Sequence, residues 1–254
     1  METILYVIIF ITGCFFGSFF TLAVYRIPRK EDILIKHSYC PNCNHKLGFL
    51  DLFPIFSYIL LKGKCRYCNN SIRIRYLLLE LFSGFVFLLI AISLKLDYYN
   101  LNAMYLVFSY LYISVLFIIA GIDKENIKIQ RGPLIFGFVL EIIYIIYKCT
   151  LNELNVYQYV IYFMLFILVL IISLISLKTA NKEKYFVQIL FLSLFIIIYS
   201  GSLIYILNVI LTLLTIAFYK IIRKKKQSLP IGFYLCVNNI ILIIITNFIC
   251  NYLL

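Results

Sequence analysis

Long apolar runs dominate the chain and limit what it can fold into. They lie near residues 4–25, 76–94, 102–120, 133–147, 157–177, 186–200, 202–219 and 230–250. A helix needs about 20 apolar residues to cross a hydrocarbon core about 30 Å thick. Only 13% of the residues are charged and the mean hydropathy is +1.00, whereas a soluble domain has about 25% charged residues. The sequence predicts an all-α polytopic membrane protein with about eight transmembrane helices.

One long polar interruption separates the first apolar run from the second. It covers residues 26–75, while every other connection is short. We therefore expect a first transmembrane helix over 1–25, a small extramembrane domain over 26–75, and a membrane domain of seven helices over 76–254. Within the first helix, Gly13 and Gly17 form a G-x-x-x-G pair, which either permits close approach of another helix or reflects ordinary small residues in a packed span.

The cations indicate how the chain is oriented. Of the 23 Lys and Arg residues, ten lie in 26–75, three in 121–132, three in 178–185 and five in 220–229. Cytoplasmic loops carry an excess of Lys and Arg, so these segments are predicted to be cytoplasmic and both termini to lie outside. Orientation and contact with anionic lipid explain the net charge of +12, and a nucleic-acid partner is not needed.

Four cysteines form two C-x-x-C pairs in the polar segment 26–75. They are Cys40 with Cys43, and Cys65 with Cys68. Four thiolates can bind one tetrahedral Zn²⁺, and such a closed set leaves no open position for a substrate. Disulfides are disfavoured in the cytoplasm, so a structural zinc site is the leading interpretation and a redox dithiol the alternative. His37 and His45 flank the first pair as spare ligands or solvated loop residues.

Several motifs in residues 13–84 resemble the type IV prepilin peptidases, a family of polytopic aspartic proteases. The first is Gly17-Ser18-Phe19 through Tyr25-Arg26-Ile27-Pro28, with Thr21 where the family has Asn. The others are Leu50 to Tyr58 leading into Gly63 to Cys68, and Ser71 to Tyr76 followed by Glu80 and Gly84, with Leu77 where Pro is common.

This resemblance implies a function at the bacterial cytoplasmic membrane. The family cleaves a short basic leader from type IV pilin-like precursors at the cytoplasmic membrane face. It then methylates the new N-terminus with S-adenosylmethionine. On this basis residues 76–254 are expected to form the peptidase domain.

The family's peptidase uses two aspartates, and this sequence matches one of them. Asp123 follows an apolar run, as the first family aspartate does, with Gln130 where Pro is expected. The second motif, G-x-G-D-x-K, is absent, because no aspartate follows Asp123 and no glycine lies between Gly137 and Gly201.

The second acid must therefore be a glutamate. Two carboxyl groups that share one proton can activate water and protonate the leaving group. Glu183 lies in the segment that replaces the missing motif and is the leading candidate, with a solvated loop acid as the alternative. Glu141 falls in the middle of an apolar run, where an acid normally faces an internal partner, and is the second candidate.

Two functional hypotheses remain open at this stage. The first is an active aspartic endopeptidase with Asp123 and Glu183 as its acids. The second is a catalytically impaired homologue that retains only methyl transfer, or that acts in pilin assembly or substrate binding.

Overall fold

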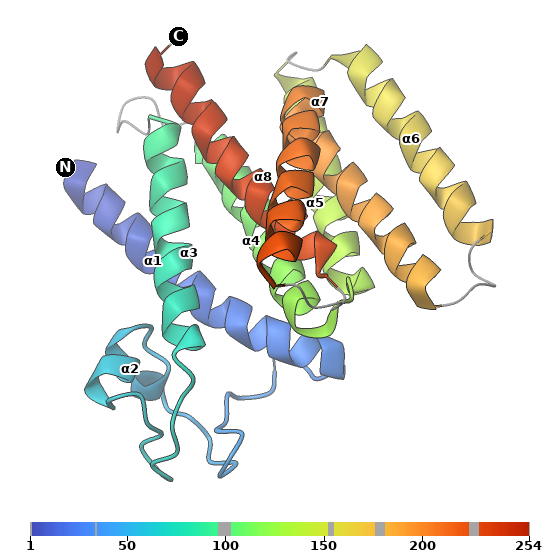
Figure 1. The fold of residues 1–254 in the computed structure, drawn as a ribbon. Coiled ribbons are helices and arrows are strands. Elements are labelled where there is room, and N and C mark those ends of the chain that lie inside the picture. The colour runs from blue at the N-terminus through green and yellow to red at the C-terminus, as the bar shows by residue number, and fades with distance from the viewer. Residues whose placement is uncertain are drawn as a thin grey trace. The chain divides into compact units, whose positions relative to one another are not determined.

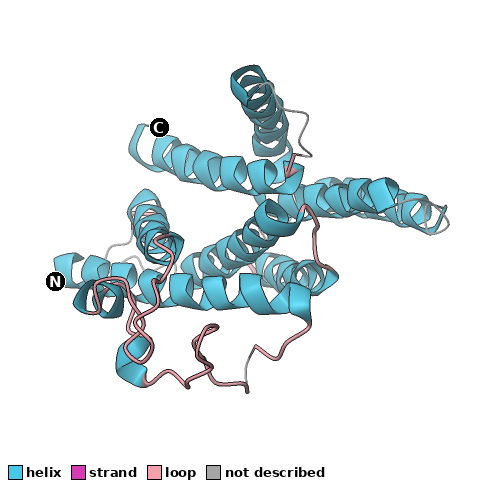
Figure 2. Cartoon of the chain, turned by 60° about the horizontal axis from the view of Figure 1, so that its bottom comes forward, coloured by secondary structure: helices cyan, strands magenta, loops and turns pink. Residues whose placement is uncertain are grey.

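The computed structural model describes residues 2–33, 35–95, 103–151, 155–175, 181–223 and 229–253, without the side chains of residues 2, 173–175, 181–184, 222 and 223. Those residues form helices and loops, with only two isolated β-bridges and no strand (Figure 2). The all-α fold class predicted from the sequence is confirmed. The chain divides into two compact units, Met1–Val107 with Asn247–Leu254, and Phe108–Thr246.

The first unit contains two membrane-length helices and the cysteine segment. Helix α1 covers Glu2–Arg26 and α3 covers Arg75–Ser93. Between them lie three short helices, η1 (Ile27–Arg29), η2 (Phe49–Asp51) and α2 (Phe56–Leu60). The domain boundaries expected at residues 25 and 75 are places where the composition changes. In the structure, α1, the cysteine segment and α3 belong to one compact unit.

Small residues allow α1 and α3 to cross closely (Figure 1). A Cβ atom added to Gly13 would lie 2.8 Å from the Cα of Gly84, and one added to Gly17 would lie 2.8 Å from the Cα of Glu80. The Ser83 hydroxyl donates a hydrogen bond across the crossing to the Gly13 carbonyl, at 2.8 Å. The G-x-x-x-G pair is thus a helix-packing face.

The second unit contains α5 (Arg131–Thr150), α6 (Val156–Ile175) and α7 (Asn181–Arg223), together with most of α4 (Ala103–Asn126) and of α8 (Ile231–Phe248). Among the described residues, six helices of the whole chain are long and apolar enough to cross a membrane, and Val156–Ile172 is a shorter apolar helix. The two runs predicted at 186–200 and 202–219 both belong to α7.

A single glycine breaks α7 into two parts. Gly201 has φ 81° and ψ 168°, a conformation open essentially to glycine alone. Figure 1 shows the ribbon of α7 turning back on itself there. The sequence expectation of two spans on either side of Gly201 therefore corresponds to one helical element with a sharp reversal.

Polar side chains hold α8 against α4 and α7 inside the second unit. The Tyr112 hydroxyl of α4 donates to the Asn239 amide oxygen of α8 at 2.8 Å. The Asn208 amide of α7 donates to the Leu235 carbonyl at 3.2 Å, and the Asn238 amide donates to the Thr212 hydroxyl at 3.1 Å. Such bonds stabilise helix pairs in lipid, where water cannot compete for the polar groups.

Substituting Gly17 tests the helix crossing. Gly17→Ala places a methyl group 2.8 Å from the Glu80 backbone, so we expect overpacking to cost about 1–3 kcal/mol of stability. Thermal unfolding of the purified protein in detergent should show a lower Tm. The matched control is Gly132→Ala, because nothing lies within 4 Å of that added Cβ; equal Tm values for the two variants would contradict the crossing.

Candidate functional site

Asp123 lies in the last turn of α4, and its side chain is fully buried. The helix continues to Asn126, beyond the predicted end of the apolar run at residue 120. The carboxylate consequently sits on a helix and not in the loop that the sequence suggested. A carboxylate in such a place must be stabilised by hydrogen bonds, because burial of an unpaired charge is costly.

Two elements far away in the sequence supply those hydrogen bonds. The Tyr185 hydroxyl of α7 lies 2.9 Å from Oδ1 and 3.0 Å from Oδ2 of Asp123. The backbone N–H of Phe233, in the first turn of α8, donates to Oδ2 at 2.9 Å. A Cβ atom at Gly232 would lie 3.0 Å from Oδ2, so a residue without a side chain allows α8 to approach the carboxylate.

The N-terminus of α8 is thus anchored by Asp123 and Tyr185 together. The Tyr185 hydroxyl accepts a hydrogen bond from the Ile231 backbone N–H at 3.0 Å. The first N–H groups of a helix lack partners within the helix and carry partial positive charge. Asp123 therefore has a structural role at this junction whatever its chemistry.

No second carboxylate contacts Asp123 among the described side chains. Glu183 lies in the first turn of α7, which begins at Asn181, and not in a loop as predicted from the sequence. Its side chain lies outside the described part of the chain. In the G-x-G-D-x-K motif the lysine follows the aspartate by two positions, so an alignment of Glu183 with that aspartate puts Tyr185 at the position of the lysine. The sequence analysis assigned no role to Tyr185.

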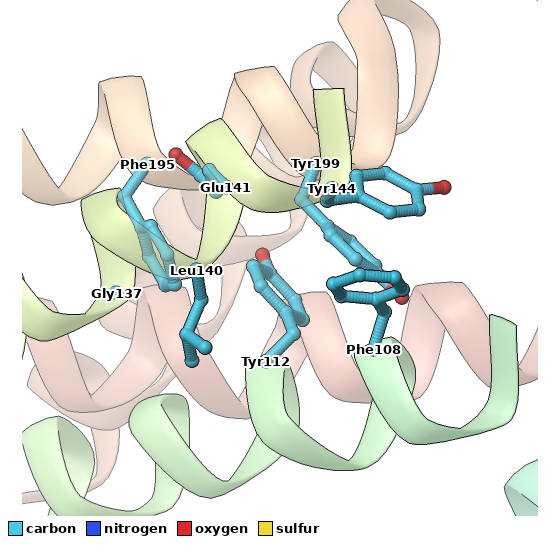
Figure 3. Close-up of a pocket in the computed structure, with 8 residues that line it drawn as sticks. All are labelled: Phe108, Tyr112, Gly137, Leu140, Glu141, Tyr144, Phe195 and Tyr199. Atoms are coloured by element: carbon cyan, nitrogen blue, oxygen red, sulfur yellow. The ribbon is translucent and has the colours of Figure 1, made fainter. Parts of the chain in front are cut away.

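Glu141, the other candidate acid, occupies a separate place in α5. Its side chain is buried, and neither carboxylate oxygen has a hydrogen-bond partner among the described residues. Figure 3 shows it beside aromatic side chains that include Tyr112, Tyr144 and Tyr199. None of the residues that contact Asp123 lines this pocket, so the geometry does not join the two acids.

Glu141 also lines a larger cavity of about 880 Å³ between α5, α6 and α7. Most of the other lining residues are apolar, and the remaining polar ones include Arg131 and Gln188. Cavities of this size with a few polar groups are typical of binding sites.

The four cysteines of the polar segment converge, as the sequence predicted. The sulfur atoms of Cys40, Cys43, Cys65 and Cys68 all lie within 4.8 Å of one another, an arrangement that could hold a metal ion. Hydrogen bonds from the Asn70 backbone and the Asn42 amide lower the pKa of the Cys68 thiol to about 7, whereas burial and the neighbouring Cys40 and Cys68 thiols raise the pKa of the Cys43 thiol to about 11. The case for a metal therefore rests on the convergence of the four sulfur atoms.

Both C-x-x-C pairs adopt the same turn. The Cys40 N–H donates to the His45 carbonyl at 3.0 Å, and the Cys65 N–H donates to the Asn70 carbonyl at 2.9 Å. The residue after each second cysteine is an asparagine with positive φ, 56° at Asn44 and 55° at Asn69, and asparagine tolerates this conformation better than most residues. The repeated C-x-x-C-N pattern was therefore a readable signal in the sequence.

Neither flanking histidine joins the cysteine cluster. The ring of His45 lies against Tyr67, with centroids 3.6 Å apart. The His37 carbonyl accepts a hydrogen bond from Arg26 at 2.9 Å. The four thiols form the candidate metal site without them.

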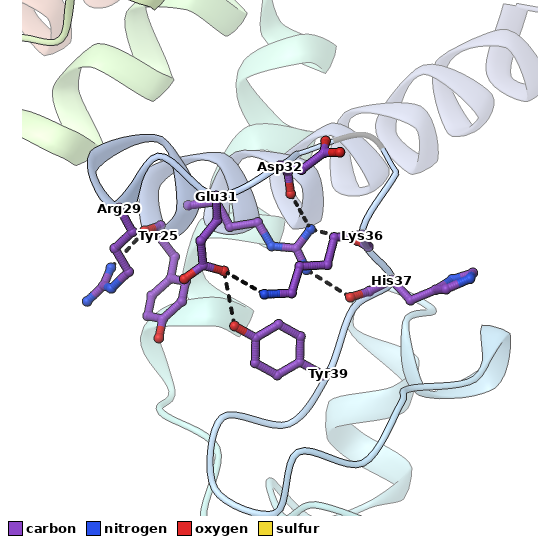
Figure 4. Close-up of polar contacts among 8 residues, drawn as sticks. Tyr25, Arg29, Glu31, Asp32, Lys36, His37 and Tyr39 are labelled. Carbon is purple, nitrogen blue, oxygen red and sulfur yellow. Dashed lines mark hydrogen bonds and ion pairs between the residues drawn. The ribbon is translucent and has the colours of Figure 1, made fainter.

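Arg26 organises the start of the cysteine segment, a role that sequence reasoning missed. Its side chain is buried and donates to the backbone carbonyls of Asp32, Lys36 and His37 at 2.7–2.9 Å. Figure 4 labels these three accepting residues and marks the hydrogen bonds to them as dashed lines. The five donors of a guanidinium suit such a cluster of carbonyls. Arg26 thereby fixes the path of the chain from α1 toward the first cysteine pair.

Comparison with known proteins gives one family match, in the N-terminal part of the chain, and several curated relatives. Residues 11–94 match the model of the bacterial peptidase A24 N-terminal domain. The chain is 37% identical over 89 residues to the prepilin leader peptidase/N-methyltransferase of Vibrio cholerae, covering 32% of this chain and 35% of that protein.

Other curated proteins with the same name give longer alignments. The protein from Bacillus subtilis is 33% identical over 129 residues, covering 51% of this chain and 50% of the relative. The protein from Klebsiella pneumoniae is 29% identical over 141 residues, covering 52% and 59%. The chain thus spans about a third to three fifths of the length of these relatives, and no solved structure matches.

Removing the Tyr185 hydroxyl tests the junction at Asp123. Tyr185→Phe deprives Asp123 of its phenolic donor and the Ile231 N–H of its acceptor, and an unsatisfied buried group costs about 1–3 kcal/mol. We expect a lower Tm in detergent. Tyr157→Phe is the control, since Tyr157 is 86% exposed, and an equally stable Tyr185→Phe protein would refute the junction.

Metal content tests the cysteine cluster. We expect close to one metal ion per chain in protein purified without chelators, and a large loss in Cys68→Ser because one of four ligands is removed. Elemental analysis measures the ratio. Cys149→Ser, at an exposed cysteine of α5 outside the cluster, should retain the metal; a metal-free wild-type protein would rule out the site.

Proposed function

We propose that this chain belongs to the type IV prepilin peptidase family, which the family match and the curated relatives support. On this premise, it acts on type IV pilin-like precursors at the cytoplasmic face of the bacterial membrane. The leading form of the proposal is a leader peptidase that also methylates the new N-terminus. The observation that carries it is Asp123, a buried acid at the end of a membrane helix.

The proposed orientation follows from the distribution of Lys and Arg. It puts the cysteine segment, the end of α4 after Asp123 and the start of α7 on the cytoplasmic side, and both termini outside. A precursor with a basic leader in the cytoplasm would then meet Asp123 at the membrane surface. The apolar part of such a precursor has a candidate place in the cavity between α5, α6 and α7.

The proposed chemistry requires a second carboxyl group beside Asp123. One acid takes a proton from water, which attacks the peptide carbonyl, and the other gives a proton to the leaving amine. Glu183 is our candidate for the partner, from the first turn of the helix that also provides Tyr185. The Tyr185 hydroxyl and the N-terminus of α8 would hold Asp123 in position.

We propose that the four-cysteine cluster binds a structural Zn²⁺. Tetrahedral zinc with Zn–S distances of about 2.3 Å places its sulfur atoms about 3.8 Å apart, and the Cys40 and Cys68 sulfurs are 3.9 Å apart. A shell of four thiolates is closed, so the metal would hold the two turns together and take no part in the reaction. S-adenosylmethionine would supply the methyl group for N-methylation, and we assign it no residues.

A second candidate function rests on the hydrogen bonds of Asp123. Both of its oxygens already accept bonds from Tyr185 and the first turn of α8, and the glycines of the family's second motif are missing. These features favour a homologue that has lost proteolysis and retains methyl transfer, substrate binding or a role in pilin assembly.

Co-expression with a type IV pilin-like precursor separates the two candidates. We expect the wild-type protein to remove the leader, and both Asp123→Asn and Glu183→Gln to leave it in place because each lacks one acid. Intact-mass measurement of the pilin distinguishes a precursor, a cleaved chain and a cleaved, methylated chain.

Glu153→Gln is the control, since Glu153 is predicted to lie on the opposite side of the membrane. An unprocessed precursor with the wild-type protein would reject the peptidase and favour the second candidate. Normal processing by Glu183→Gln, with none by Asp123→Asn, would reject Glu183 alone.

A further inference from the structure

The cysteine segment carries a patch of exposed apolar side chains that the proposed function does not use. It consists of Phe49, Leu50, Phe56, Ile59 and Leu60, from η2 and α2, and we call it the η2–α2 patch. Phe49 is 76% exposed and Leu60 is 78% exposed. A contiguous apolar surface of this kind marks a contact with another molecule or a membrane.

The patch is one face of an element whose other face is fixed. Phe56, Ile59 and Leu60 are spaced three and four residues apart, so they lie on one side of α2. Tyr58 lies on the other side, where its hydroxyl donates to the Ile72 carbonyl at 3.3 Å and its ring packs beneath Gly63. The apolar face is therefore presented outward by a supported helix.

Contacts with α1 and α3 show which environment the patch meets. The ring of Phe53, between η2 and α2, lies 5.3 Å from the ring of Phe15 in α1. It also lies 6.3 Å from Phe49 and 5.5 Å from Phe56. A run of aromatic rings thus joins the patch to the exposed apolar surface of a membrane-length helix within the same unit.

The link to α3 is a hydrogen bond to a strained turn. Ile55 has φ 64° and ψ −54°, and the Phe56 N–H bonds to the Pro54 carbonyl at 2.6 Å, which defines a γ-turn. Such a conformation costs about 1–3 kcal/mol unless its surroundings enforce it. The Glu80 carboxylate of α3 accepts the Ile55 N–H at 2.8 Å, and so helps to hold α2 at a fixed height along α3.

Cations follow the patch along the chain. Lys62, Lys64, Arg66 and Arg73 are all exposed, and Arg66 pairs with Asp51 at 2.8 Å. Exposed aromatic and aliphatic side chains flanked by Lys and Arg are typical of segments that lie in the membrane interface, where the cations meet anionic head groups.

We propose that the η2–α2 patch inserts into the interface of an anionic lipid bilayer, with Lys62 and Lys64 on its head groups. The cysteine segment is then held against the membrane surface and is not a freely moving extramembrane domain. The inference rests on the first unit alone and does not depend on whether the chain is an active peptidase.

The absence of tryptophan from the chain makes a fluorescence test direct. Leu60→Trp places a single reporter in the patch, and the protein is reconstituted, one copy per disc, in nanodiscs of phosphatidylcholine and phosphatidylglycerol. With brominated acyl chains we expect blue-shifted emission, quenched several-fold relative to unbrominated discs. One copy per disc excludes burial of the patch by a second chain.

Lys46→Trp is the matched control, since Lys46 is exposed in the cysteine segment and outside the patch. Its emission should stay red-shifted and nearly unquenched. Equal quenching of the two reporters, or no quenching at Leu60→Trp, would overturn the insertion.

A second comparison tests the head-group contact. We combine Lys62→Gln and Lys64→Gln in the Leu60→Trp protein. In anionic discs the two changes should reduce quenching of the tryptophan emission by brominated acyl chains. In discs of phosphatidylcholine alone they should leave the quenching unchanged. Unchanged quenching in anionic discs would remove the role of the two lysines. Metal content equal to that of the wild type verifies that the cysteine segment remains folded in each variant.

Discussion

The carboxylate of Asp123 is the point on which the second unit depends. It is fully buried at the end of α4, and its hydrogen bonds come from α7 through Tyr185 and from α8 through Phe233. In a chain this apolar, a buried anion without donors would be strongly destabilising. The positions of three helix ends are therefore coupled to one side chain, and any chemistry at Asp123 has to operate within that hydrogen-bonded junction.

In the first unit, a polar segment is attached to two membrane-length helices, α1 and α3. The small residues at Gly13 and Gly17 bring α1 and α3 into close contact. Arg26 gathers three backbone carbonyls where the chain leaves α1, and Glu80 holds the turn at Ile55 from α3. The cysteine cluster is thus built on a base that is fixed at both ends, and a metal would complete it.

The match to the bacterial peptidase A24 N-terminal domain lies within the first unit. The matched region, residues 11–94, contains the four cysteines and Arg26. In the second unit, the segment where the resemblance predicts a second aspartate motif has neither the glycines nor the aspartate of that motif, and Tyr185 in this segment donates to Asp123. Bonds from Tyr185 and Phe233 reach both oxygens of Asp123, and no second carboxylate contacts it among the described side chains, which is the physical reason that both candidate functions are retained.

The sequence by itself determined the features that depend on local spacing and composition. Apolar length predicted the helical membrane class. The two C-x-x-C pairs predicted the convergence of Cys40, Cys43, Cys65 and Cys68, because each pair places two thiols on one tight turn and four thiolates suit one tetrahedral metal ion. Only the tertiary structure decided the partners of Asp123, the isolation of Glu141 and the carbonyl cluster around Arg26. The bonds of Asp123 join helix ends that lie 62 and 110 positions apart in the chain, and such contacts leave no periodic trace in the sequence. The bonds of Arg26 span only 6 to 11 positions, but they depend on the path of a loop that follows no repeating pattern.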